Sequence, residues 1–316
     1  MRTTMRKDRA QPDSKGPAHD LARTVFDPAM RFTAGVNGLA RALATGALFA
    51  GATAAAIAGT GHSATGARAM KWILNGPALS ALAADASANR FLKDAQPFVM
   101  QRDGDPGVPQ DWKALPIRSY TSYAHLKRAL ETNAVDPNVR AILYDNEGWA
   151  FTPAEEQRDP ATYTRMAAEL VHAHHLLFIT APAVDLTRTL APGPEKRYDA
   201  YLRLRLAADS ARYADVYNIQ AQGSERNVER YSSFVKAAAQ QARSANPKVI
   251  VLAGISTNPS GLRVSADDVM RAIDATRTYV QGYWFNIPQP GEYCPKCNDF
   301  RPDIAIEVFR RLSSAR

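Results

Sequence analysis

The sequence predicts an α/β protein, and specifically a single (β/α)8 barrel, the TIM barrel. Short apolar runs alternate with longer amphipathic stretches, which is the pattern of parallel strands joined by helical crossovers. This pattern occupies 247 of the 316 residues, the usual size of one barrel. No glycine-rich phosphate loop follows any predicted strand, which disfavours the competing fold, a doubly wound open sheet.

The composition is that of a globular protein, with 22% charged and 46% hydrophobic residues. It excludes a mostly disordered or collagen-like chain, and two cysteines are too few for a disulfide-dense mini-protein. The net charge of +8 would suggest an acidic partner such as nucleic acid. However, residues 1–69 hold nine Lys/Arg and four acidic residues, so most of the excess lies there. With no basic stripe interleaved with aromatic residues, we expect no nucleic-acid partner.

Residues 1–69 are predicted to be a leader, and residues 70–316 the barrel domain. A basic segment precedes the alanine-rich stretch Ala42–Ala58, and Ala67-Arg68-Ala69 offers the small residues that a signal peptidase accepts. We expect export, which makes the protein secreted or extracytoplasmic. The second alternative is an uncleaved membrane anchor over residues 42–60, the only expected contact with a membrane, and the third is a disordered arm on a cytoplasmic protein.

Eight strands and at least six helices are expected in the body. The first third supplies three weak strands, and the remainder supplies five clear ones. The strands are Trp72–Asn75, Phe98–Gln101, Ile117–Tyr120, Val139–Asp145, Leu176–Thr180, Asp215–Gln220, Val249–Ala253 and Val280–Ile287. The helices are His125–Glu131, Ala161–His174, Lys196–Arg212, Asn227–Ala245, Ala266–Tyr279 and Ile304–Leu312.

In a barrel of this class the chemistry lies at the carboxyl ends of the strands. There the sequence places Asp145 and Glu147, which alternation puts on one face, about 7 Å apart. Mutual repulsion and partial burial would raise one pKa and make a general acid usable near neutral pH. The alternative is a solvated pair, or one paired with an arginine. The flanking Tyr144 and Trp149 are candidate substrate-binding residues.

Two further strand ends carry polar or aromatic side chains. Asn218, Gln220 and Gln222 alternate along one strand and would line one face with amides, which suit a hydroxyl-rich or acetamido ligand. Trp284 and Asn286 share a face of the last strand. Trp284 is predicted either as a platform for a sugar ring or as a core aromatic residue. The expected partner is therefore a carbohydrate.

These motifs together resemble the family 18 glycoside hydrolases, closest to the plant and fungal chitinase type. The resemblance lies in the order of a D-x-E pair, an Ile-Thr-Ala-Pro strand, the strand Asp-Val-Tyr-Asn-Ile-Gln-Ala-Gln and a last strand with tryptophan, between Val139 and Ile287. It implies that Glu147 is the general acid and that Asp145 orients the acetamido group of the substrate, whose oxygen is the nucleophile. It also implies that Gln220 binds ligand and that Trp284 is the platform.

The sequence departs from the family motif D-x-x-D-x-D-x-E, because Leu143 and Arg140 stand where the family has acids. Gln222 stands where a tyrosine is usual. These departures leave open a carbohydrate-binding barrel without turnover, and a barrel enzyme of unrelated chemistry. An ordinary two-carboxylate mechanism would need an acid facing Glu147 across the mouth. Asp185, Glu225 and Glu292 qualify for that by position.

Cys294 and Cys297 form a lone C-x-x-C, which is half of a zinc site. In an exported protein we expect it to form a local disulfide, and a redox role is less favoured. Three histidines between 172 and 175 lie at the predicted bottom of the barrel, with no acidic or cysteine cluster at ligand spacing. We therefore expect no metal and no cofactor.

Overall fold

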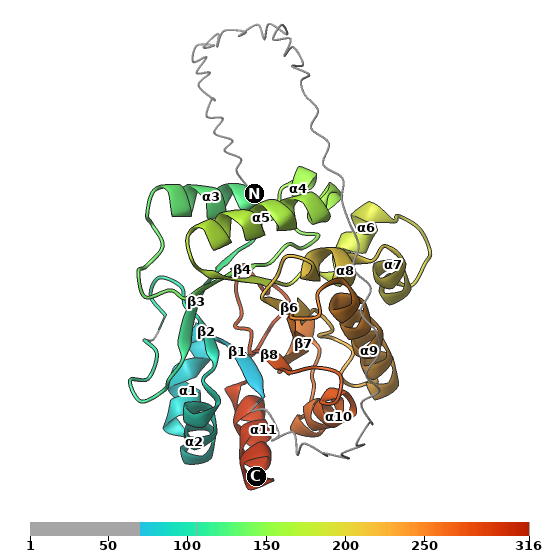
Figure 1. The fold of residues 1–316 in the computed structure, drawn as a ribbon. Helices are drawn as coiled ribbons and strands as arrows, with labels where there is room; N and C mark the ends of the chain where they lie inside the picture. Colours follow the sequence, from blue (N-terminus) through green and yellow to red (C-terminus); the bar gives the residue numbers. More distant parts are fainter. Residues whose placement is uncertain (1–69, 106, 316) are drawn as a thin grey trace, which may run out of the picture. The chain divides into compact units, whose positions relative to one another are not determined.

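A computed structural model describes residues 70–105 and 107–315, so the predicted leader lies outside the described residues. Eight parallel strands pair in sequence order, and β8 pairs back onto β1, which closes the barrel (Figure 1). The predicted (β/α)8 fold is therefore confirmed. The strands are β1 Lys71–Asn75, β2 Phe98–Met100, β3 Leu115–Tyr120, β4 Ala141–Tyr144, β5 Leu177–Thr180, β6 Val216–Ile219, β7 Ile250–Ser256 and β8 Gly282–Asn286.

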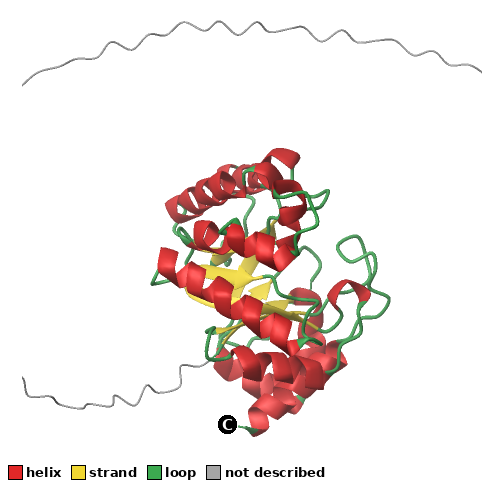
Figure 2. Cartoon of the chain, turned by 90° about the vertical axis from the view of Figure 1, so that its right-hand side faces the viewer, coloured by secondary structure: helices red, strands yellow, loops and turns green. Residues whose placement is uncertain are grey.

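The helices lie outside the ring of strands (Figure 2). They are α1 Leu79–Ala84, α2 Ala86–Ala95, α3 Tyr123–Glu131, α4 Ala154–Arg158, α5 Pro160–Ala173, α6 Thr187–Leu190, α7 Arg197–Arg203, α8 Leu206–Ala211, α9 Val228–Ala245, α10 Ala266–Thr276 and α11 Pro302–Ser314. Three single turns of 3-10 helix accompany them: η1 Gly76–Ala78, η2 Val184–Leu186 and η3 Pro259–Gly261.

The predicted single helix Lys196–Arg212 is wrong. The chain forms α7 and α8 instead, because Arg205 between them has a φ of 58°, which is left-handed backbone and ends the helical hydrogen-bond ladder. No glycine or proline lies at this break, so the apolar periodicity continues from α7 into α8 and predicts a single helix. Helices α1, α2, α4 and α6 were not predicted.

Alternation along the strands creates two apolar layers. Ile73, Leu143 and Leu252 point into the barrel and pack against one another. The residues next to them in sequence, such as Trp72 and Ile142, point outward and are covered by the helices. Most strands are buried on both faces, which explains why they appear in the sequence as apolar runs, and β3, in which only Ile117 is buried, is the exception.

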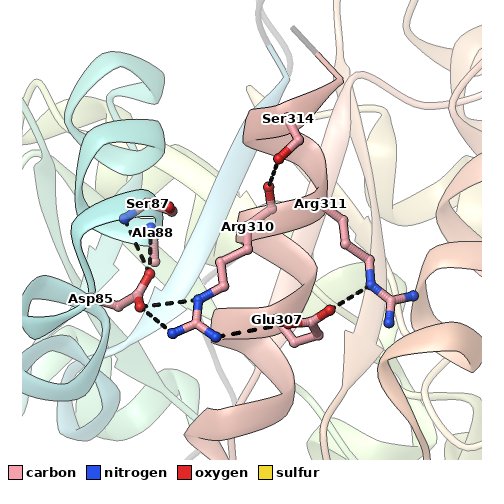
Figure 3. Close-up of polar contacts among 7 residues, drawn as sticks. All are labelled: Asp85, Ser87, Ala88, Glu307, Arg310, Arg311 and Ser314. Carbon is pink, nitrogen blue, oxygen red and sulfur yellow. Dashed lines mark hydrogen bonds and ion pairs between the residues drawn. The ribbon is translucent and has the colours of Figure 1, made fainter.

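The barrel closes where β1 meets β8, with Trp72 opposite Tyr283. Gly282 is required at this junction, because a Cβ atom there would lie 1.9 Å from the carbonyl oxygen of Lys71. Outside the strands, Nη2 of Arg310 on α11 lies 2.6 Å from Oδ2 of Asp85 (Figure 3). Asp85 also accepts the backbone N–H of Ala88 and so caps α2. This ion pair joins α11, the last helix, to the N-terminus of α2.

Candidate active site

A cavity of about 600 Å³ lies at the carboxyl ends of the strands. Asn75 and Asn286, the last residues of β1 and β8, line it, and so does Asp145, the first residue after β4. Its volume is within the range of sites that hold a small molecule or a short stretch of polymer. This is the end of the barrel at which the sequence placed the chemistry.

Asp145, Glu147 and Gln220 meet in this cavity. Nε2 of Gln220 donates to Oδ1 of Asp145 at 2.8 Å and to the backbone oxygen of Ala181 at 2.8 Å, and lies 3.1 Å from Oε1 of Glu147. An amide nitrogen carries two hydrogens, so the longest of the three contacts is the weakest. Gln220 therefore fixes the Asp145 carboxyl group by the stronger hydrogen bond and constrains the Glu147 carboxyl group less.

Burial changes the protonation of both carboxyl groups. Asp145 is 8% exposed, and its desolvation raises its pKa to about 7. Arg102 acts against this increase, whereas Asp185 adds to it. Burial also raises the pKa of Glu147 well above its ordinary value, and the negative charges of Asp145 and Asp185 raise it further. Both shifts favour the protonated form of the two carboxyl groups, which is the form that a general acid requires.

A third carboxylate, Asp185 of η2, lines the cavity. Its Oδ1 accepts the backbone N–H of Gly148 at 2.8 Å. A Cβ atom on Gly148 would lie 3.0 Å from the backbone oxygen of Asp185, so the two loops approach closely. The other two acids that qualified by position do not line the cavity: Glu225 accepts the N–H groups of Gly223 and Ser256, and Glu292 is exposed on the surface.

Most, but not all, of the predicted amide and tryptophan residues line the cavity. Gln220, Gln222, Trp284 and Asn286 line the cavity. Trp284 is 5% exposed and belongs to the core inside the barrel, so its ring forms part of the base of the cavity. Gln222 lies against the backbone of Gly254, where a Cβ would be 2.4 Å from the side-chain carbonyl of Gln222.

Two predicted substrate-binding residues do not line the cavity. Tyr144 points outward to the helices, because alternation places it on the face opposite Asp145. Its hydroxyl donates to Oε2 of the buried Glu156 at 2.5 Å. Asn218 points inward but lies one layer below Gln220 and is fully buried. Neither polar atom of its side chain has a hydrogen-bond partner among the described residues.

The loop after β8 forms another wall of the cavity. Cys294 and Cys297 are joined by a disulfide within it, and Cys294 and Tyr293 line the cavity. The Tyr293 ring contacts Phe151 at 5.0 Å and Trp149 at 6.0 Å between ring centroids. Trp149 also lines the cavity, so an aromatic cluster from two loops stands beside the carboxyl groups.

Sequence reasoning missed several cavity residues. They are Arg102, Asp105, Arg188, Arg197, Tyr198, Arg230 and Tyr293. Most of them lie on loops or short helices whose positions depend on tertiary packing. Asp105 and Arg102 follow β2, which was predicted as Phe98–Gln101 and ends at Met100. Their position after a strand end was therefore a signal that could have marked them as candidates.

Within the described part of the chain, no group of three His, Cys, Asp or Glu side chains is arranged to hold a metal ion. The same residues contain no helix with the length and apolar character needed to cross a bilayer.

No protein-family model and no curated protein matches the sequence. Similar solved structures include a chitinase from Chromobacterium violaceum, with 14% identity, 77% of this chain and 99% of that chain covered, and a TM-score of 0.44. Another is the spore cortex-lytic enzyme SleL of Bacillus megaterium, with 11% identity, 76% of this chain and 73% of that chain covered, and a TM-score of 0.43. A third is a sugar phosphate isomerase/epimerase of Parabacteroides distasonis, with 12% identity, 80% and 96% of the two chains covered, and a TM-score of 0.44. These similarities concern the fold alone.

Proposed function

We propose that the protein is a glycoside hydrolase acting on a glycan that contains N-acetylated amino sugars, with Glu147 as general acid. The observation that carries the proposal is the pair Asp145 and Glu147, joined through Gln220 inside a cavity at the carboxyl ends of the strands. Asp145 is buried and Glu147 is half-buried, and desolvation raises the pKa of both, which suits acid catalysis.

The resemblance to the family 18 glycoside hydrolases supplies the roles. Protonated Glu147 gives its proton to the glycosidic oxygen as the bond to the anomeric carbon breaks. The carbonyl oxygen of the substrate's own acetamido group forms a bond to that carbon, while Asp145 accepts the acetamido N–H. Water then opens the resulting ring and loses a proton to the Glu147 carboxylate, which restores the acid. The hold of Gln220 on Asp145 suits the orienting role, and the freer Glu147 suits the proton donor.

A carbohydrate-binding barrel without turnover is the second candidate, and two observations favour it. The inward side chain beneath Asp145 is Leu143, which belongs to the apolar core inside the barrel. The family motif has an acid at this position, so the carboxyl group that it would place beneath Asp145 is replaced by an apolar side chain. Gln222, in place of the family's tyrosine, also removes a phenolic donor from the cavity.

The deciding experiment is a turnover screen with chromogenic N-acetylglucosamine oligomers and other glycans. Wild type is compared with Glu147→Gln and with the control Glu155→Gln, whose side chain is exposed on α4. Turnover lost by a factor of about 10² to 10⁴ only in Glu147→Gln supports the hydrolase. Binding without turnover in all three proteins supports the second candidate. Absence of glycan binding would exclude both.

The proposal includes export through the leader over residues 1–69. Its support is the sequence alone, with a basic flank, an uncharged alanine-rich stretch and the exit Ala67-Arg68-Ala69. N-terminal sequencing of the mature protein from the medium or periplasm is expected to begin near Met70. Intact Met1 on a soluble cytoplasmic protein would contradict export.

A further inference from the structure

Four arginines line the cavity: Arg102, Arg188, Arg197 and Arg230. All four are exposed. Among the described residues, no carboxylate oxygen lies within 4.0 Å of any of their guanidinium groups. The acids that line the cavity have other partners: Asp185 accepts the N–H of Gly148, Asp145 accepts the amide of Gln220, and Asp105 accepts the backbone N–H of Arg102. The charge of Arg102 still acts on Asp145 and lowers its pKa. Arg188, Arg197 and Arg230 therefore present positive charge that no described carboxylate pairs with.

Three of these arginines come from one part of the barrel. Arg188 is on α6, Arg197 begins α7, and Arg230 is in the first turn of α9. Helix α7 contacts both α6 and α9, so the three helices form a continuous group beside the ends of β5 and β6. We call Arg188, Arg197 and Arg230 the arginine wall. Arg102, from the loop after β2, is not part of it.

The position of Arg230 is unfavourable for the helix that carries it. Helix α9 has 18 residues, and a cation in its first turn lies at the positive end of the helix dipole. The negative charge of Glu229, in the same turn, would be favourable at this end of the helix, but Glu229 does not line the cavity. The sequence thus directs a cation into the cavity at a cost to the helix, and the dipole adds to the positive potential there. An anionic ligand would gain from both.

Aromatic rings hold two of the guanidinium groups. The Arg230 guanidinium carbon lies 4.8 Å from the centroid of the Tyr198 ring. That ring is stacked on Phe234 at 3.9 Å, and its hydroxyl pairs with Ser224 at 2.7 Å. The Arg102 guanidinium lies 4.2 Å over the Tyr293 ring. A guanidinium fixed by its face keeps its N–H edge free for an anion, and that edge matches the two oxygens of a carboxylate or sulfate.

We propose, on the basis of the hydrolase function above, that the glycan is acidic and that the arginine wall binds its carboxylate or sulfate groups. The carboxyl pair would then lie beside the sugar that is cleaved, and the arginine wall beside charged sugars further along the chain. A neutral glycan bound in the cavity would offer no negative group to the three guanidinium groups of the arginine wall.

The test measures the affinity of the full chain for size-matched hexasaccharides that all contain N-acetylhexosamine. The probes are a neutral N-acetylglucosamine hexamer, a hyaluronan hexamer with carboxylates, and a chondroitin sulfate hexamer with carboxylates and sulfates. Glu147→Gln is used as the background so that turnover does not remove the ligand. At low salt we expect the acidic hexamers to bind about tenfold more tightly than the neutral one, and this advantage to shrink as salt is added.

The variants decide whether the arginine wall is the cause. Arg188→Gln, Arg197→Gln and Arg230→Gln combined are expected to remove the advantage of the acidic hexamers and to leave the neutral one unchanged. The matched control is Arg203→Gln on α7, whose guanidinium is paired with Glu195 and does not line the cavity. It is expected to bind all three as the background does. A thermal melt of each variant checks folding.

Several outcomes would overturn the inference. If acidic and neutral hexamers bind alike, or if the triple variant keeps the advantage, the arginine wall does not select charge. If a single-stranded oligonucleotide of equal charge binds as tightly as the acidic hexamers, the selection is for charge alone and not for an acidic glycan. In each case hydrolysis of the neutral oligomer would leave the proposed hydrolase standing. Binding of no hexamer would exclude both proposals.

Discussion

Nε2 of Gln220 lies 2.8 Å from Oδ1 of Asp145, although the two residues follow strands that are not neighbours. Gln220 follows β6 and Asp145 follows β4, with β5 between them. The amide crosses β5 by also donating to the backbone oxygen of Ala181, which follows that strand. One side chain thus fixes the spacing of three strand ends and the orientation of the carboxyl group that lies among them.

Gln220→Ala is therefore expected to change the pH dependence of hydrolysis as well as its rate. The hydrogen bond from Gln220 lowers the pKa of both Asp145 and Glu147, so its loss raises both values. Glu147 then stays protonated to higher pH, and the alkaline limb of kcat moves upward while kcat falls by about 10- to 100-fold.

The control for this variant is Gln222→Ala, which lines the same cavity without a hydrogen bond to either carboxyl group. This variant is expected to change KM and to leave the alkaline limb of the pH dependence of kcat unchanged. An identical limb in wild type and Gln220→Ala would show that Gln220 does not tune the pair.

Asp145→Asn is expected to be more stable than wild type at pH 8 and equally stable near pH 4. Burial raises the pKa of Asp145 to about 7 in the folded protein, against about 4 in an unfolded chain. The folded state is thus favoured while the group is protonated, and that contribution is lost as pH rises from about 4 to about 7. The difference at pH 8 is about 1–4 kcal/mol.

Urea unfolding at several pH values measures this difference. Asp94→Asn, an exposed residue of α2, is the control and is expected to follow wild type. A difference between Asp145→Asn and wild type that stays constant from pH 4 to pH 8 would refute the raised pKa.

Gly282→Ala is expected to cost about 3 kcal/mol or more, or to prevent folding, because its Cβ would overlap the backbone of β1. Gly254→Ala is the matched case on β7. There the nearest atoms belong to the side chain of Gln222, which can rotate away, so the expected cost is below about 1.5 kcal/mol. Equal losses in chemical denaturation would mean that barrel closure is not what requires Gly282.

Tyr144→Phe is expected to lower stability without changing the cavity. It removes the hydroxyl that donates to Glu156, a buried carboxylate that also accepts from Ser122 and from the backbone of Tyr123. The loss is about 1–2 kcal/mol, seen as a lower urea midpoint. Glycan affinity and the pH profile should match wild type. Weakened glycan binding at unchanged stability would place Tyr144 back in the substrate site.

The alternation of side chains made much of this site predictable. Leu143 of β4 and Asp145 and Glu147, which follow that strand, all point inward, as a period of two along an extended chain predicts. The same rule should have excluded Tyr144, which falls on the opposite face. Depth was not predictable in this way. Asn218 has the inward phase of Gln220 but lies two residues deeper, where the barrel encloses it completely.

Arg102, Arg188 and Tyr293 could not be found from periodicity, because they lie in loops or in a helix of one turn, whereas Arg197 and Arg230 lie at the starts of helices that were predicted. Arg188 lies on a helix of four residues, and Tyr293 lies in an irregular loop stapled by Cys294 and Cys297. Their place in the cavity is decided by which loops meet above the barrel. The break at Arg205 is of the same kind, since a left-handed arginine has no signal in the sequence.

The pairing of β1 with β8 also sets the order in which the chain can reach its final form. Trp72 finds its partner only when Tyr283 has been made, more than 200 residues later. Until then the edge of β1 that pairs with β8 has no partner, and closing the ring needs a long-range contact. The ion pair between Asp85 and Arg310 likewise needs a residue that follows β8 in the chain. A ribosome stalled before residue 282 would hold a chain that cannot complete the cavity.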